Sequence, residues 1–366
     1  MYAVVETKLR KSMIQNLGVR LKVKKKNRLM VISGIFIILM LAVLPFIGGC
    51  ATAGSLPATV SIQTTPLASL YHVVGTGLAK VITDHTPIKA IATPMSGFEA
   101  SLPLFNTGEI DFGICNGSNS QDAFYALRGF SGTKGFDIRI VQVGFPLLTC
   151  NIVREDSGIT KISDLKGKRV CWGYDAAPFL QQLNLSALTT AGLGEKDIIL
   201  VPVATFVDAV RLVGDGKADC ATVGVGAGVV SEVSSRTPLV WLSAEADQAA
   251  AKRIAEILPG CYPAVAKAGS HPIIKKDTTF LAEDTFFVAR GTLNEAVTYI
   301  VAKALYDYRD ELVPINPAFN QWTRDRMVIE RIFVPYHAGA IKFYKEVGLW
   351  TNKIEGIQKG LLAKKK

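Results

Sequence analysis

The sequence has few of the residues and motifs that mark a metal site or a catalytic centre. HExxH, GxSxG and P-loop motifs are missing. The six cysteines include no CxxC pair, which argues against a zinc site and against dithiol redox chemistry. The four histidines have no metal-binding spacing; they are His72, His85, His271 and His337. We therefore expect no metal, no cofactor and no catalytic residue, and we predict that the protein is not an enzyme.

Basic residues are concentrated at the N-terminus and are balanced by acidic ones elsewhere. The chain of 366 residues has a net charge of +10, from 41 Lys and Arg against 31 Asp and Glu. Residues 1–49 hold nine of the basic residues and one acid, so the remainder has 32 against 30 and a net charge of +2. That remainder shows no basic stripe interleaved with aromatic residues. The pattern excludes a nucleic-acid-binding protein.

The N-terminal segment is typical of an export signal. The basic stretch KVKKKNRLM leads into residues 29–47, which carry no charge, and IGGC then ends at Cys50. We predict a lipoprotein signal peptide at 1–49, attachment of a lipid to Cys50, and a tether at 50–57. The alternative is an uncleaved anchor, because the apolar run approaches the ~20 residues that span a bilayer. Both interpretations make residues 51–366 periplasmic or extracytoplasmic and hold them at the membrane.

After the tether, strand-like and helix-like segments alternate. Strands separated by helices predict an α/β fold with parallel or mixed sheets. Because this pattern restarts after residue 150, we expect two lobes joined by strands that cross near 145–155 and return near 270–290. Lobe one is assigned to 58–150 with 270–350, lobe two to 151–269, and a basic tail to 351–366.

One unit of the sequence occurs twice, at an offset of 108 residues. Residues 98–118 and 206–226 each read as an amphipathic helix, a glycine, a turn aspartate and a buried strand. Gly108 and Gly216 suit the left-handed position that ends a helix. Asp111 and Asp219 are expected to cap backbone amides within their turns. The repeat predicts the same structural piece in each lobe.

Loops that follow strands are the candidate binding residues, since ligands of open α/β sheets bind at the carboxyl ends of strands. Unpaired amides at the helix starts that follow could hold an anion. Tyr71 and Tyr174 could cover a ligand, Asp175 could pair with a ligand amine, and ordinary helix capping by Ser69, Ser96 and Asp175 is the alternative. Leu70, Met95, Phe98 and Phe179 hint at a less polar ligand. The candidate substrate-binding residues are Ser69, Tyr71, Ser96, Gly97, Asn116, Tyr174, Asp175, Ala176, Gly224 and Gly226.

Several of these motifs resemble one family, the TAXI-type solute-binding proteins of TRAP transporters. SLYHVVGTGLAKVI is similar to the Tyr-Tyr-Pro-x-Gly loop of that family, with Tyr71, His72 and Gly75 at the matching positions. PYHAGAIKFYKEVGL is similar to its C-terminal Pro-x-His-x-Gly-Ala signature, at His337, Gly339 and Ala340. The family's second Tyr is His72 here, and its Gly-Gly-Ser is Met95-Ser96-Gly97. The resemblance covers about residues 58–350.

This resemblance implies a fold of the periplasmic binding protein type II class, with a hinge-lined cleft between the lobes. It also implies that a small organic acid or amino acid is delivered to TRAP membrane permease subunits, driven by ions rather than ATP. An ABC-importer solute-binding lipoprotein is the nearest alternative. An enzyme on the same two-lobed fold, or a sensor subunit, is less favoured.

Overall fold

The computed structural model describes residues 56–175 and 177–364. The predicted signal peptide, Cys50, Ala176 and most of the tether lie outside the described residues, as do the last two residues of the chain. The strands are β1 (Thr59–Thr64), β2 (Lys89–Pro94), β3 (Phe112–Asn116), β4 (Ile138–Arg154), β5 (Arg169–Gly173), β6 (Ile199–Val203), β7 (Cys220–Gly224), β8 (Leu239–Trp241), β9 (Tyr262–Ala266) and β10 (Thr278–Arg290). The α-helices are α3 (Leu70–His85), α4 (Phe98–Thr107), α5 (Gly117–Tyr125), α6 (Phe179–Thr190), α7 (Phe206–Gly214), α8 (Gly228–Ser234), α9 (Gln248–Ile257), α10 (Glu295–Asp307), α11 (Ala338–Glu346) and α12 (Asn352–Lys364).

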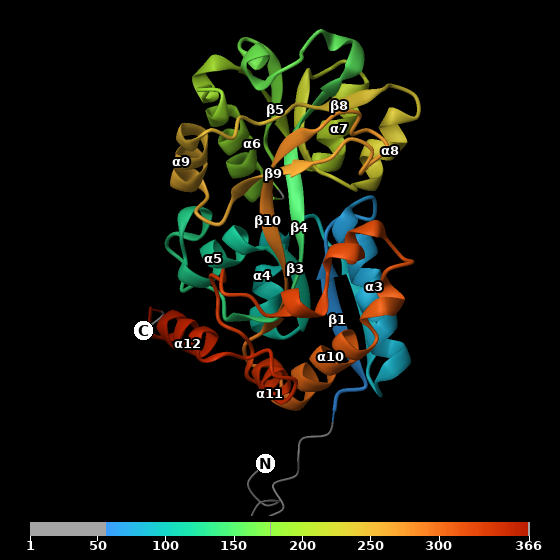
Figure 1. The fold of residues 1–366 in the computed structure, drawn as a ribbon, viewed down its shortest axis with the longest axis vertical. Helices are drawn as coiled ribbons and strands as arrows, with labels where there is room; N and C mark the ends of the chain where they lie inside the picture. The colour runs from blue at the N-terminus through green and yellow to red at the C-terminus, as the bar shows by residue number, and fades with distance from the viewer. Residues whose placement is uncertain (1–55, 176, 365–366) are drawn as a thin grey trace, which may run out of the picture. The chain divides into compact units, whose positions relative to one another are not determined.

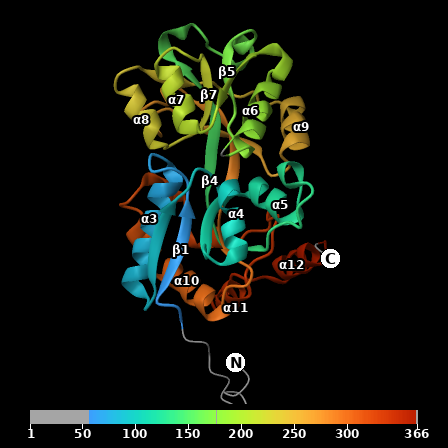
Figure 2. The same ribbon diagram turned by 180° about the vertical axis from the view of Figure 1, so that it is seen from behind.

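The strands form one mixed sheet in the order β2-β1-β3-β10-β4-β7-β5-β6. Pairs such as β1 with β2 and β5 with β6 are parallel, whereas β4 and β10 run antiparallel to each other and to their other neighbours. The long strands β4 and β10 pass from one group of elements to the other (Figures 1 and 2). They are therefore the connection between two lobes.

Each lobe has its own hydrophobic core. The first core takes residues from β1 to the start of β4 and from Phe286 onward, and the second takes residues from Cys150 to Leu281. Along β4 and β10 the cores change over near Leu147 and Asp284. The predicted two-lobed α/β fold is thus confirmed.

The chain re-enters lobe one later than residue 270, the position predicted from the sequence. Ile274, Phe280 and Leu281 pack in the second core, although residues from 270 onward are assigned to lobe one. The reason is that β9 pairs antiparallel with the first half of β10, which holds this segment on lobe two.

Three further segments differ from the sequence interpretation. Residues 138–154 are a single strand rather than a strand pair, and 317–332 contains two 3-10 turns in place of a helix. The expected basic tail at 351–366 contains helix α12, which buries Ile354 and Leu361 on one face. Gln358 fastens this helix, because its side chain accepts from the backbone N–H of Tyr336 at 2.8 Å and donates to that residue's carbonyl at 3.1 Å.

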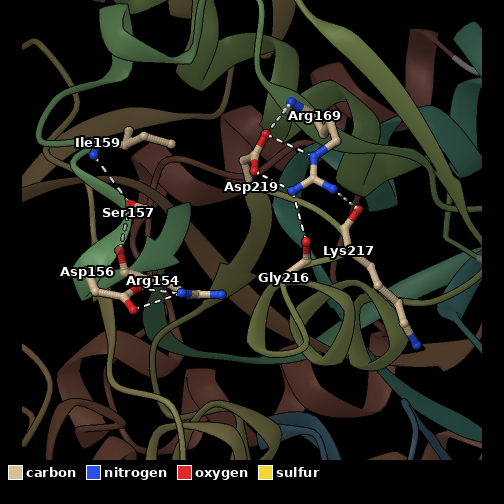
Figure 3. A network of polar contacts seen from close by, with 8 residues as sticks. All are labelled: Arg154, Asp156, Ser157, Ile159, Arg169, Gly216, Lys217 and Asp219. Atoms are coloured by element: carbon tan, nitrogen blue, oxygen red, sulfur yellow. Dashed lines mark hydrogen bonds and ion pairs between the residues drawn. The ribbon is translucent and has the colours of Figure 1, made fainter.

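The repeated unit makes the same contacts in both lobes, and its aspartates bond to a neighbouring strand rather than within their own turns. Asp111 Oδ2 accepts from the backbone N–H of Ser61 at 3.0 Å, and Asp219 Oδ2 accepts from that of Arg169 at 2.8 Å. Ser61 and Arg169 are themselves separated by the 108-residue offset. Each carboxylate therefore joins its turn to the neighbouring strand, β1 or β5, instead of capping the turn itself. Figure 3 shows the lobe-two copy, where the Arg169 guanidinium also contacts Asp219.

Replacing Asp219 or Asp111 with Ala is expected to lower the free energy of unfolding by about 1–3 kcal/mol, because a partly buried strand amide loses its acceptor. Denaturant titration measures the change. Asp156→Ala is the control. Asp156 pairs with Arg154 at the surface (Figure 3), so its replacement should change the free energy of unfolding little. Equal losses in Asp219→Ala and Asp156→Ala would contradict the assigned role.

Candidate functional site

A cavity of about 100 Å³ lies between the lobes. Its walls come from loops and helix starts that follow β1, β2, β3, β5, β6 and β7, together with β4 and α6. Strand ends of both lobes therefore meet at one space, as expected for an open α/β sheet. The lining residues are Thr65, Ser69, Leu70, Tyr71, Ser96, Gly97, Phe98, Glu99, Ile114, Cys115, Asn116, Asn119, Leu147, Thr149, Ala177, Phe179, Leu180, Leu183, Phe206, Val223, Gly224 and Ala227.

Most of the lining is apolar, and both lobes contribute to it. Leu70 and Phe98 come from lobe one, while Phe179, Leu183 and Phe206 come from lobe two. Among the lining residues that the structure describes, none is Lys, Arg or His. Closing such a space around an apolar group removes that group from water, which favours binding by about 25 cal/mol per Å².

A chain of hydrogen bonds fixes the polar groups on the lobe-one side. The Tyr71 hydroxyl donates to Asn116 Oδ1 at 2.7 Å, and Asn116 Nδ2 donates to Glu283 Oε2 at 3.2 Å. Glu283 Oε1 accepts from the backbone N–H of Ser118 at 3.2 Å. These contacts determine which way the Asn116 amide faces. Glu283 is 1% exposed, and this burial raises its pKa to about 7.

A second carboxyl group lies where the lobes meet. Glu99 is in the first turn of α4, and its Oε1 accepts from the backbone N–H of Phe179, at the start of α6, at 3.1 Å. The contact crosses from lobe one to lobe two. Removal from water raises the pKa of Glu99 to about 7. On the α3 side, the N–H of Val229 donates to the carbonyl of Ala68 at 3.3 Å, which is another bond between the lobes.

Six of the ten predicted site residues line this cavity. They are Ser69, Tyr71, Ser96, Gly97, Asn116 and Gly224. Four are not among its lining residues. A Cβ atom at Gly226 would lie 3.5 Å from the side chain of Leu70, Asp175 lines a neighbouring groove, Tyr174 is buried in lobe two, and Ala176 lies outside the described residues.

Tyr174 was predicted to cover a ligand, and the structure corrects this. Its side chain is 0% exposed, and its hydroxyl accepts from the backbone N–H of Thr222 at 3.0 Å. The pairing of β5 with β7 is limited to Val170 and Cys220, and two residues further along β7 the hydroxyl of Tyr174 is the acceptor for the N–H of Thr222. The backbone of Tyr174 is left-handed, with φ 51°, a conformation uncommon for residues other than glycine.

The helix starts around the cavity are largely occupied by the protein's own groups. Ser69 accepts from the N–H of His72 at 3.1 Å, which is ordinary N-capping. The start of α6 donates to Glu99, and Ser96 and Asp175 cap no helix. His72, at the position of the family's second Tyr, bonds Thr64 Oγ1 at 2.9 Å. The predicted convergence of free amides on an anion is therefore not seen at α3 or α6.

Sequence reasoning missed Glu99, Asn119, Thr149 and Glu283. Glu99 lies in an amphipathic helix and meets Phe179 across 80 positions of the chain, so no local pattern marks it. Glu283 offered one signal, because an acidic residue inside the apolar strand LAEDTFFVAR needs a buried partner.

Two other features bear on the chemistry of the described residues. Within 56–175 and 177–364, no group of three or more His, Cys, Asp or Glu side chains is placed to hold a metal ion. Over the same ranges, every helix is too short or too polar to pass through a bilayer.

Several solved structures are similar to this chain. The alkanesulfonate-binding protein SsuA from Xanthomonas axonopodis pv. citri, bound to MOPS, matches with 17% identity, 85% of each chain covered and a TM-score of 0.46. The periplasmic aliphatic sulphonate binding protein SsuA from Escherichia coli matches with 18% identity, 83% of this chain and 84% of that one covered, and a TM-score of 0.46. A mutant of ArgBP from T. maritima matches with 13% identity, 72% and 95% covered, and a TM-score of 0.44.

The sequence pattern of the NMT1-like family matches residues 62–348. This range takes in both lobes, both connecting strands and every lining residue of the cavity. The chain belongs to the NMT1-like family.

Proposed function

We propose that this protein is an extracytoplasmic solute-binding receptor that encloses one small organic molecule between its lobes. The observation that carries the proposal is the cavity, which takes its walls from both lobes. Among the strands that the structure describes, only β4 and β10 connect these lobes within the sheet. A two-lobed protein of this kind binds by hinge closure, and a solute stabilises the closed form through contacts that exist only there.

We further propose that the receptor is held to the membrane through Cys50 and delivers its solute to a TRAP-type permease. The support is the motif resemblance at Tyr71, Gly75, His337, Gly339 and Ala340. In the structure, His337 caps α11, where its Nδ1 accepts from the N–H of Gly339. That signature is therefore part of the scaffold and leaves the ligand open to change. The organic acid or amino acid implied by the resemblance stays a prediction.

The test is a thermal-shift screen of the full chain, purified in detergent, against organic acids, amino acids and amines, with product analysis of each hit. Saturable stabilisation without product supports a receptor; at a hundredfold excess over Kd it amounts to about 2.7 kcal/mol. Turnover of a hit would instead support an enzyme. Uptake into vesicles that contain the candidate partner permease then separates the two transport classes, since a TRAP system needs an ion gradient and an ABC importer needs ATP.

Filling the cavity should abolish binding without unfolding the protein. Ala227 lines the cavity from lobe two at the start of α8, and Ala227→Phe would place a ring in a space of about 100 Å³. We expect the affinity for any solute found in the screen to fall at least tenfold, as measured by calorimetry. The control is Ala268→Phe on the exposed surface of the same lobe. Unchanged affinity in Ala227→Phe would place the solute elsewhere.

A further inference from the structure

The cavity combines apolar walls with a carboxyl group in a way that limits the charge of its solute. Within the described lining, Glu99 alone carries a carboxyl group, and no basic side chain is present to offset it. A solute anion would have to enter beside this group and give up its hydration without gaining a cation. Burying an unpaired charge in this way is costly.

The groove that adjoins the cavity has the same sign of charge. Its volume is about 370 Å³, and it shares Glu99, Asn119 and Phe179 with the cavity. Asp122 and Asp175 also line it, and Arg128 is its basic residue. Arg128 is already paired, since its Nε donates to Asp122 Oδ2 at 2.6 Å. A cation approaching through this groove meets an attractive field, and an anion meets a repulsive one.

Three of the donors near the cavity that could offset an anion are engaged by the protein itself, whereas the starts of α4 and α8 have no side-chain cap. The amide of Phe179 donates to Glu99, and the amide of His72 donates to Ser69. Asn116 Nδ2 donates to Glu283, a second carboxyl group behind the lobe-one wall. The lining also includes acceptors, among them the Glu99 carboxyl group and the hydroxyl groups of Thr65 and Thr149, which can accept as well as donate.

We propose that the solute is a small amine with an apolar body, whose ammonium group pairs with the Glu99 carboxylate while the body packs between Phe98 and Phe179. This inference rests on the receptor function proposed above and narrows its ligand class. It departs from the organic acid that the sequence resemblance implies. A solute of a few carbon atoms fits the space, since a cavity of about 150 Å³ accommodates benzene.

Three probes with one branched body separate the possibilities: isoamylamine, leucine and isocaproate carry an ammonium group, both groups, and a carboxylate. Calorimetry uses the full chain in detergent at pH 8, where Glu99, with its pKa raised to about 7 by burial, is ionised. We expect isoamylamine to bind at least tenfold more tightly than isocaproate. Glu99→Gln should weaken isoamylamine at least tenfold and leave isocaproate unchanged or improved.

Glu109→Gln is the matched control, because Glu109 is exposed just beyond the same helix and is not a lining residue. Circular dichroism and the Tm check that Glu99→Gln folds. Tighter binding of isocaproate or leucine, equal binding of all three, or full affinity for isoamylamine in Glu99→Gln would each overturn the inference. The receptor function would still stand if another solute bound in the cavity. It would be contradicted only by a screen that finds no binding solute or one in which the solute is turned over.

Discussion

Replacing Tyr174 with Ala is expected to lower the free energy of unfolding by about 3–5 kcal/mol, the cost of deleting a buried aromatic side chain from a core. The ring is fully buried in lobe two, so its removal leaves a hole among well-packed neighbours. The hydroxyl also satisfies the N–H of Thr222, which would lose its partner. Denaturant titration monitored by fluorescence or circular dichroism measures the change.

Tyr174→Phe separates the two contributions, because it keeps the ring and removes only the hydroxyl. We expect it to cost about 1–3 kcal/mol, for the amide left unpaired in the core. Tyr71→Phe is the informative comparison, since Tyr71 faces the cavity and should affect binding. A Tyr174→Ala protein that keeps its stability and loses solute affinity would restore the ligand-covering role predicted from the sequence.

The repeated unit could be predicted from sequence because it is made of local signals. Gly108 and Gly216 both end up left-handed, at φ 81° and 69°, where an L side chain would be strained. The amide two residues into each following strand is also served by a side chain in both lobes: Ile114 N–H faces Gln63 Oε1 at 3.4 Å, and Thr222 N–H bonds Tyr174. The accepting side chains are of different types, Gln63 and Tyr174, so comparing the sequence with itself at the 108-residue offset does not indicate this shared hydrogen bond.

The site was predictable only in part, and Glu99 shows why. Loop positions after strands follow from the alternation of strands and helices, which led to Ser69, Ser96, Asn116 and Gly224. Glu99 instead depends on how one lobe docks on the other, a relation between residues far apart in the chain. The prediction of a basic tail at 351–366 was wrong for a similar reason. Helix α12 is held by tertiary contacts, namely the burial of Ile354 and Leu361 and the bonds of Gln358 to Tyr336, which the local sequence does not indicate.

The stability of the protein should fall as the pH rises from about 4.5 to 7, and Glu283 should be a principal cause. Burial raises the pKa of Glu283 from 4.5 to about 7, against the lowering effect of the bonds from Ser118 and Asn116. The folded state then binds a proton that the unfolded state has released, so the free energy of unfolding decreases across this window. Below pH 4.5 both states are protonated and the contribution is fully present; above 7 it is lost.

This rise in the pKa of Glu283 corresponds to a decrease in the free energy of unfolding on the order of 3 kcal/mol between pH 4.5 and 7. Glu283→Gln removes the titrating group, so its unfolding free energy should depend less on pH than that of the wild type, as measured by urea titrations at pH 4.5, 6 and 8. Glu256→Gln, on the exposed part of α9, should keep the wild-type slope. Glu99→Gln tests whether the other carboxyl group with a raised pKa adds to the pH dependence of the unfolding free energy.

An unchanged slope in Glu283→Gln would mean that this carboxyl stays ionised beneath the cavity, balanced by its two N–H donors. A solute ammonium in the cavity would then have a second fixed negative charge behind Asn116.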